Sequence, residues 1–578
     1  MSLPKLRAWA VLAMIAMVGT PALAAGRKAR VDLQVQDLEH HVKAGQKLRL
    51  IIQPDGSTSN SSLLQQLRSK GVKIRRQHGK IGRFSIEVSG TNLSWVETLK
   101  GIGGVSVDAP INHASLDMSQ TPVAPPDGTG NVLRSLLGLE ADLHYGAGVG
   151  VAVIDSGIAP VPDLAGRISA FYDFTNGQGG VATTPVDGYG HGTHVAGLIA
   201  GNGMLSAGQY AGVAPDAHLI GLRVLDNAGA GSTSDVIAAI EFAAAHKADL
   251  GIDVINLSLG HPPYESATTD PLVAAVTAAE QAGIVVVVSA GNVGVNPATG
   301  QVGYAGILSP GNAPAALTVA SVKPMGTVDP SDDLIANYSS RGPSWYDGYA
   351  KPDVAVPGQM LVAPFAPGSY IGTTYPELLV ADATGNNSYV SLSGTSMAAA
   401  VESGLVAVTI QAHREAQATM HPPVPVICDP MDLTCDPSAT TPSGPDLTPN
   451  AIKAFMEYTA FPMHDANGVQ YDALSEGAGH INGQGVVALV QSVDTSVPVG
   501  SPWLVYPVNE YSTIGGVTVQ WGQNVVWGEN VVWGENIVWG ENVVWGENVV
   551  WGENIVWGEN IVWGENIVWG ESVLGGLL

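Results

Sequence analysis

The chain has 578 residues, of which 45% are hydrophobic, so it is long enough for more than one domain and for a large buried core. Its formal charge of −26 is unevenly spread: residues 27–120 hold 14 Lys and Arg against 8 Asp and Glu, whereas residues 121–578 hold 9 against 43. This acidity argues against nucleic acid as a partner. A basic part before an acidic part suggests that the two attract each other, although acidity also serves solubility alone.

The N-terminus has the pattern of a secretory signal peptide. Lys5 and Arg7 precede an apolar run over residues 8–18, and small residues follow, which places a cleavage site after Ala24. An uncleaved membrane anchor is the alternative, but the run is shorter than a spanning helix needs. We therefore expect a secreted or extracellular protein, with a signal peptide at 1–24 and an N-terminal spacer at 25–45.

Residues 46–112 have the pattern of a small α+β module. The predicted order of elements is β-α-β-β-α-β, which is the ferredoxin-like arrangement. The clearest segments are strands at 48–52, 84–88 and 105–107 and helices at 60–70 and 91–99. The next stretch, 113–135, is rich in Ser, Pro, Gly and Asp, so it is predicted to be an exposed linker with a processing site.

From residue 147 the pattern changes to apolar strands that alternate with helices. Strands are predicted at 148–154, 219–225, 254–259, 284–288 and 317–322, and helices at 191–201, 233–246 and 271–282. This alternation indicates a parallel sheet covered by helices on both faces. Chemistry in such sheets gathers at the carboxyl ends of strands, where Asp155 and Asn292 stand.

Ser396 follows a Gly-Thr turn and opens an Ala-rich run, so it is predicted to lie at a helix N-terminus. The helix dipole there favours a developing negative charge, as a nucleophile requires. A structural N-cap is the competing interpretation, and capping preferences alone favour it.

His191 and His194 open another predicted helix, directly after a Gly-rich loop. Zinc binding would need a third ligand that is not nearby. A single functional histidine, His191, with His194 packed behind it, is the better interpretation. Its natural partners are an acid that orients the ring and a hydroxyl that the ring deprotonates.

Taken together, these segments resemble the subtilisin-like serine proteases, whose acid, base and nucleophile occur in the order Asp, His, Ser. The main matches surround Asp155, His191 and Ser396. Supporting matches lie at 212–215, 256–260, 289–292, 340–343 and 351–353. The resemblance covers about residues 140–492. It implies an α/β fold, a subtilisin-like parallel sheet with helices on both faces, and it identifies the N-terminal module as similar to the family's inhibitor prodomain.

The resemblance implies a role for each matched residue. Asp155, His191 and Ser396 correspond to the catalytic triad, and Asn292 corresponds to the side chain that donates to the oxyanion. Substrate would lie along Ser258, Leu259 and Gly260, with Ala290 and Gly291 as the other wall of the side-chain pocket. Val293 replaces an acidic residue of some relatives, which favours a large apolar side chain before the scissile bond.

Cofactor and metal expectations follow the same resemblance. No cofactor is required for catalysis and no metal site is assigned. Asp163 matches an aspartate that binds calcium in some relatives, whereas residues 202–210 do not clearly match, so a structural calcium stays open. Ala400 replaces a proline of many relatives. Glu402 replaces an apolar residue, so we expect its side chain to be exposed or paired with another group.

The catalytic domain is expected to span 136–500, with a Pro-rich insert at 416–447. The insert holds the only cysteines, Cys428 and Cys435, which are predicted to form one local disulfide in an exported protein. Two thiols alone do not make a metal site.

A repeat tail is expected at 501–578. Tryptophan recurs every six residues from 521 to 569, mostly as Trp-Gly-Glu-Asn-Val-Val, which is compatible with a β-solenoid or a stack of short strands. A surface-exposed tail of variable length is one interpretation. A module that attaches the protein to a cell surface, carbohydrate or metal ions is the other.

Three functions are compatible with these patterns. The leading one is a secreted serine endopeptidase, expected to be monomeric, that acts on polypeptides and is made as a zymogen with its own prodomain as inhibitor and folding assistant. The second is an inactive relative that acts as a surface or adhesive protein through its repeats. The third is a dedicated processing enzyme with a single partner, which the sequence does not separate from the first.

Overall fold

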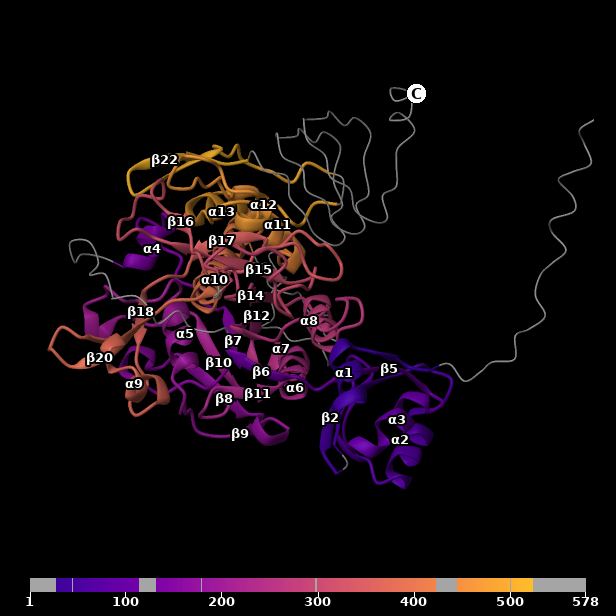
Figure 1. Ribbon diagram of the computed structural model, residues 1–578. Helices are drawn as coiled ribbons and strands as arrows, with labels where there is room; N and C mark the ends of the chain where they lie inside the picture. Colours follow the sequence, from indigo (N-terminus) through magenta and orange to yellow (C-terminus); the bar gives the residue numbers. More distant parts are fainter. Residues whose placement is uncertain are drawn as a thin grey trace, which may run out of the picture. The chain divides into compact units, whose positions relative to one another are not determined.

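The structure is a computed structural model that describes residues 28–522 apart from 44, 114–130, 178, 297–298, 423–443 and 499–500. The chain forms two compact units, which Figure 1 colours along the sequence from indigo to yellow. The smaller holds Met1–Ile74 and Ile86–Val107, and the larger holds Arg75–Ser85 and Asp108–Leu578. The predicted signal peptide, Cys428, Cys435 and the repeats beyond residue 522 lie outside the described residues.

A five-stranded sheet in the order β1-β5-β2-β4-β3 forms the basis of the smaller unit, although the end of β3 and the start of β4 are counted in the larger unit. The elements are β1 (Arg30–Val31), α1 (Leu33–His41), β2 (Lys47–Pro54), α2 (Asn60–Ser69), β3 (Lys73–His78), β4 (Arg83–Ser89), α3 (Leu93–Thr98) and β5 (Ile102–Val107). From β2 to β5 they follow the predicted β-α-β-β-α-β order. The segment predicted to be a spacer instead forms β1 and α1. Only Val35 of α1 is buried, so this helix has no apolar stripe for a pattern to reveal.

The larger unit contains a nine-stranded, mostly parallel sheet in the order β16-β15-β14-β12-β7-β10-β8-β9, with β17 also beside β15. The strands are β7 (Gly150–Asp155), β8 (Ile168–Asp173), β9 (Val181–Ala182), β10 (His218–Arg223), β12 (Ile252–Leu257), β14 (Val285–Ser289), β15 (Leu317–Lys323), β16 (Leu334–Ile335) and β17 (Val354–Pro357). The five predicted strands are confirmed. β7 lies at the centre and every residue of it is buried, as expected for a strand covered on both faces.

Helices cover the sheet in two groups. α5 (His191–Ala200) and α13 (Gly483–Gln491) pack against α10 (Thr395–Met420), which contacts β7, β12, β14, β15 and β17. α6 (Thr233–Ala245) and α8 (Pro271–Gln281) pack against each other and against β12 and β14. The first 19 residues of α10 are all buried, so this helix forms the centre of the hydrophobic core.

The remaining elements are short. They are β6 (Pro110–His113), α4 (Val132–Leu136), β11 (Ala230–Ser232), α7 (Lys247–Leu250), β13 (Leu259–Gly260), β18 (Leu361–Pro364), α9 (Tyr370–Thr374), β19 (Leu379–Ala381), β20 (Asn387–Leu392), α11 (Pro449–Thr459), α12 (Ala473–Glu476), β21 (Tyr511–Ile514) and β22 (Val517–Gln520). Two further sheets have three strands each, in the orders β11-β6-β13 and β18-β20-β19, and β21 pairs with β22.

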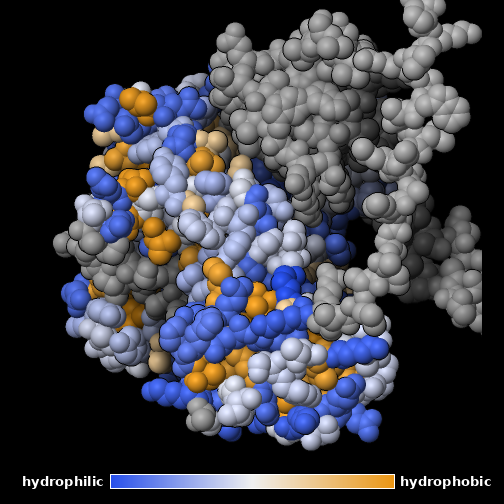
Figure 2. Space-filling model, turned by 45° about the vertical axis from the view of Figure 1, so that its right-hand side comes forward, coloured by the Kyte–Doolittle hydropathy of each residue, from blue (hydrophilic) through white to orange (hydrophobic). Residues whose placement is uncertain are grey.

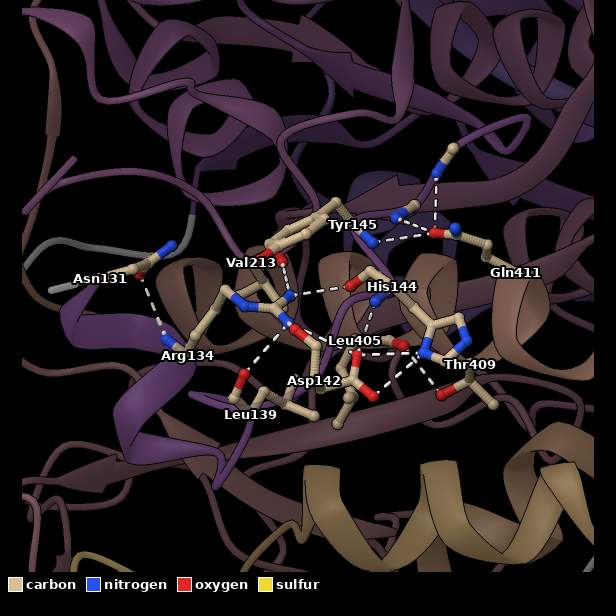
Figure 3. Close-up of polar contacts among 12 residues, drawn as sticks. Asn131, Arg134, Leu139, Asp142, His144, Tyr145, Val213, Leu405, Thr409 and Gln411 are labelled. Carbon is tan, nitrogen blue, oxygen red and sulfur yellow. Dashed lines mark hydrogen bonds and ion pairs between the residues drawn. The ribbon is translucent and has the colours of Figure 1, made fainter.

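One buried arginine fixes the segment that precedes β7 (Figure 3). The guanidinium of Arg134 lies 4.4 Å from the ring of Tyr145. It donates hydrogen bonds of 2.7 to 3.1 Å to the carbonyl oxygens of Leu139, Asp142, His144 and Val213. On the same segment, Oε1 of Gln411 accepts the backbone N–H groups of residues 145–147. The segment that leads into β7 is therefore attached directly to α10.

The hairpin β21–β22 packs against α13 (Figure 1). The first repeat tryptophan, Trp521, contacts Tyr458 of α11. Trp521 is 1% exposed and lies edge-on to Tyr458 of α11, with ring centroids 6.0 Å apart. Its Nε1–H donates to Ser512 Oγ at 3.1 Å, and the N–H of Thr513 donates to Oε1 of Gln484 on α13. Residues up to 522, predicted to begin a separate tail, thus belong to the packed unit.

The surface combines polar and apolar side chains. On the face drawn in Figure 2, hydrophobic side chains lie in small groups among hydrophilic ones, as on ordinary globular proteins. Across the part of the chain that the structure describes, every helix is too short or too polar to cross a membrane.

Candidate active site

Asp155 and His191 form a buried pair. β7 ends at Asp155 and α5 begins at His191, and both side chains are fully buried. Nδ1 of His191 lies 2.8 Å and 2.9 Å from the two carboxylate oxygens of Asp155. Because an ionised carboxylate only accepts, Nδ1 carries the proton and Nε2 is the basic nitrogen of the neutral ring. Burial disfavours the charged ring, but the charge and hydrogen bond of Asp155 more than offset it, so the pKa of His191 is raised.

Ser396 is the second residue of α10 and is fully buried. Its Oγ donates to the carbonyl oxygen of Ser258 at 3.2 Å, and Ser258 Oγ donates to the carbonyl oxygen of Ser396 at 2.9 Å. β7 and β12 pair with Ile154 opposite Leu257, so Asp155 and Ser258 leave the sheet side by side. These contacts bring the start of α10 to the sheet edge where Asp155 lies.

Asn292 contacts the turn that precedes Ser396. Its Oδ1 accepts hydrogen bonds from the N–H of Thr395 at 3.0 Å and from Thr395 Oγ1 at 2.9 Å. A side chain on Gly394 would begin 3.0 Å from Nδ2 of Asn292. The amide is therefore oriented with its oxygen toward Thr395 and its nitrogen on the Gly394 side, next to the backbone of the predicted nucleophile.

The predicted pocket walls lie beside the same turn. The N–H of Gly291 donates to Thr395 Oγ1 at 3.2 Å, and the carbonyl of Ala290 accepts the N–H of Leu308 at 3.0 Å. Gly291 has φ of 110°, and a Cβ there would lie 2.7 Å from Leu308 Cγ, so only glycine fits. Leu259 and Gly260 form β13, and both residues pair with another strand of this chain.

The partner of β13 is β6, a strand that the sequence analysis did not predict. β6 lies antiparallel between β11 and β13, with Asn112 opposite both Ala230 and Gly260. The side chain of Ile111 is 0% exposed. No pattern revealed β6, because a four-residue strand that begins with a proline is too short to show alternation. An extended segment from before the linker thus occupies the edge at which substrate was expected.

Asp163, whose position suggested a calcium ligand, is held by protein donors. Its Oδ1 accepts the N–H of Leu205 at 3.0 Å and its Oδ2 accepts the hydroxyl of Tyr389 at 2.6 Å. Both carboxylate oxygens of this buried side chain are thus bonded to protein donors. Burial, helped by Asp163, raises the pKa of Tyr389, so the hydroxyl keeps its proton. Among the described residues, no group of three His, Cys, Asp or Glu side chains could hold a metal ion.

The expectation for Glu402 is wrong. Its side chain on α10 is fully buried, and neither carboxylate oxygen has a hydrogen-bond partner among the described residues. Burial raises the pKa of Glu402 to about 8. The sequence could not show this, because a glutamate on a helix is usually solvated. His194, in contrast, is buried as predicted. Its Nε2 lies 3.0 Å from the carbonyl oxygen of Leu361, and burial lowers its pKa to about 3.

Comparison with known proteins agrees with this geometry. The sequence model of the Subtilase family matches residues 146–480. The chain belongs to the subtilase family. Serine protease AprX of Bacillus subtilis is 41% identical over 271 residues, which are 46% of this chain and 58% of that relative. Thermitase of Thermoactinomyces vulgaris is 35% identical over 276 residues, which are 48% of this chain and 79% of that relative.

Other matches show how much of each relative this chain covers. A subtilisin of Bacillus sp. (strain TA39) is 36% identical over 45% of this chain and 56% of its own length. This subtilase thus spans somewhat more than half the length of AprX and of that subtilisin. The crystal structure of fervidolysin from Fervidobacterium pennivorans matches with a TM-score of 0.54 and 22% identity over 80% of this chain and 63% of that chain. That match supports the predicted subtilisin-like α/β fold.

Proposed function

We propose that this subtilase is a secreted serine endopeptidase that hydrolyses peptide bonds through Asp155, His191 and Ser396. The observation that carries the proposal is the buried hydrogen-bonded pair of Asp155 and His191 at the sheet edge that Ser396 also reaches through Ser258. This combination of acid, base and hydroxyl at one edge supplies the groups needed for acyl transfer.

The reaction follows from the protonation of these groups. As the Oγ of Ser396 attacks a peptide carbonyl, its proton passes to Nε2 of His191, and Asp155 stabilises the resulting imidazolium. The peptide C–N bond then breaks, and the imidazolium returns the proton to the leaving amine. Water repeats the steps to release the acid. Asn292 and the backbone N–H of Ser396, at the N-terminus of α10, supply donors to the transient oxyanion.

We further propose that the chain is made as a zymogen. The support is β6, which occupies the edge between β11 and β13 as a peptide substrate would, with its next residues entering the 113–135 linker.

The substrate preference is proposed from Val293. Its side chain is 49% exposed beside the predicted pocket, at a position where some relatives carry an acidic residue, and this supports a preference for a large apolar side chain. No cofactor enters this scheme. The signal pattern supports export, and the repeat tail is proposed to contact a surface outside the cell.

The test compares the full chain with Ser396→Ala and with Ser403→Ala. Ser403 lies on the same helix, and its Oγ donates to Oδ1 of Asn256 at 3.0 Å, so it is a matched control. We expect the full chain and Ser403→Ala to acquire a new N-terminus within 113–135 and to react with a fluorophosphonate. Ser396→Ala should do neither. Processing of Ser396→Ala on its own, or labelling that survives the substitution, would contradict the proposal.

A further inference from the structure

A second buried carboxylate lies directly behind the Asp155–His191 pair. Asp187 is 5% exposed and belongs to the loop that leads into α5. Its Oδ1 accepts hydrogen bonds from Ser156 Oγ at 3.0 Å and from the N–H groups of Tyr189 and Gly190 at 3.1 and 2.7 Å. Its Oδ2 accepts from the N–H and Oγ1 of Thr193 at 2.8 and 2.7 Å. All five partners are donors, so the ionised carboxylate is the form that they fit.

These contacts cap α5, the helix that begins at His191 and whose own N-cap residue has no side chain. α5 begins after Gly190, which has φ of 104° and no side chain that could cap the first turn. Asp187 takes this role from three residues upstream, because it binds the N–H groups of Gly190 and Thr193. A carboxylate at this position satisfies orphan N–H groups and complements the helix dipole. The direction in which His191 leaves the helix therefore depends on Asp187.

The same carboxylate also holds the end of β7. Ser156, which follows Asp155, donates to Asp187 and accepts the N–H of Gly192 at 3.0 Å. Asp187 and Gly157 form a backbone bridge. A Cβ on Gly192 would lie 2.1 Å from the carbonyl oxygen of Gly157 and 3.1 Å from the Cβ of Asp155, so the two segments touch. One side chain thus links the strand that ends in the acid to the helix that begins with the base.

The charges around the ring give Asp187 an electrostatic effect as well. The ionisable groups that face His191 are Asp155 from β7, Asp187 from the loop and His194 from α5 itself. His194 is neutral, because burial lowers its pKa to about 3. Burial and the charge of Asp155 raise the pKa of Asp187, while its hydrogen bonds oppose that rise. As an anion, Asp187 favours the protonated ring of His191.

We propose that Asp187 is a positioning residue for the proposed hydrolysis: it aligns His191 with Asp155 and stabilises the imidazolium that forms when Ser396 loses its proton. The inference rests on the proposed function, since it assigns a role within the same reaction. It predicts two separate effects of removing the charge, one on turnover and one on the pH at which the base titrates.

The test is Asp187→Asn, compared with Asp270→Asn. Asp270 is also a buried carboxylate at a helix start, where it accepts the N–H of Leu272 and the hydroxyl of Ser309. For Asp187→Asn we expect kcat to fall about 10- to 100-fold with KM little changed. The acid limb of the kcat/KM profile should move about one pH unit lower, because the imidazolium loses a neighbouring anion. Asp270→Asn should lose stability without moving that limb.

Two further measurements keep the outcome decisive. The His191 ring is titrated by NMR in Ser396→Ala protein with and without Asp187→Asn, which reports the shift even if the wild type proves inactive. If Asp187→Asn does not fold, Ser156→Ala is used, which keeps the charge but removes the link to Gly192. That variant should lower kcat without moving the acid limb. For Asp187→Asn, an unchanged kcat together with an unchanged His191 titration would overturn the proposal. For Ser156→Ala, an unchanged kcat would do so.

Discussion

Glu402 allows a direct test of the packing of the core. Its carboxyl group is buried there and has no hydrogen-bond partner in the part of the chain that the structure describes. In the folded protein the pKa of Glu402 is raised to about 8, whereas the ordinary value is 4.5. Below pH 4.5 the carboxyl is neutral in the folded and unfolded chain, so ionisation costs nothing. As the pH rises from 4.5 to 8, only the unfolded chain ionises, and the free energy of unfolding falls. Above pH 8 the loss levels off.

The size of this loss in the free energy of unfolding follows from the interval between the two pKa values of Glu402. Each pH unit contributes about 1.4 kcal/mol, so the loss reaches about 3 kcal/mol at pH 7 and about 5 kcal/mol above pH 8. Glu402→Gln removes the ionisation and keeps the shape, so its free energy of unfolding should not show this fall. Glu402→Leu should in addition remove the unpaired polar group, so we expect it to exceed the parent by more than about 3 kcal/mol at pH 7.

The assay is urea unfolding followed by tryptophan fluorescence between pH 4.5 and 9, with every variant carrying Ser396→Ala to prevent self-digestion. Glu415→Gln is the control, because Glu415 lies on the same helix with its side chain 58% exposed. Its difference from the parent should stay small at every pH. A gap between the parent and Glu402→Gln that stays constant from pH 4.5 to 8 would refute the reasoning.

Three other predictions concern the site and its supports. Asn292→Ala should lower kcat about 100- to 1000-fold with little change in KM, which is the loss that a subtilisin shows without its corresponding donor; an unchanged kcat in steady-state assays would remove Asn292 from the oxyanion site. Trp521→Ala should cost about 3 to 5 kcal/mol in urea unfolding, whereas Trp503→Ala, at a site 40% exposed, should cost much less; equal costs would contradict the packing. Ile111→Asp should slow N-terminal processing at least about 10-fold in a time course, because a charge would enter a buried position, and wild-type timing would argue against β6 as the processed strand.

The sequence by itself determined the central strands and helices of the large sheet, and the family. Uniform apolar runs predicted the buried parallel strands, since such strands show no alternation when both faces are covered. Local glycine-rich turns placed Asp155 after a strand and His191 and Ser396 at helix starts. These assignments depend on neighbouring residues only, so a single sequence contains them. The motifs that surround them were specific enough to indicate a subtilase, and the family match confirms this.

Only the tertiary structure decided which distant groups meet. Tyr389 donates to Asp163 from 226 positions away, a partner that the local motif does not indicate. Glu402 is enclosed by helices and strands that its own helical pattern does not specify. Asp187 binds both the end of β7 and the start of α5, although its sequence context is an ordinary loop. Side-chain periodicity reports the direction of a residue within its own element, whereas these contacts depend on how separate elements pack.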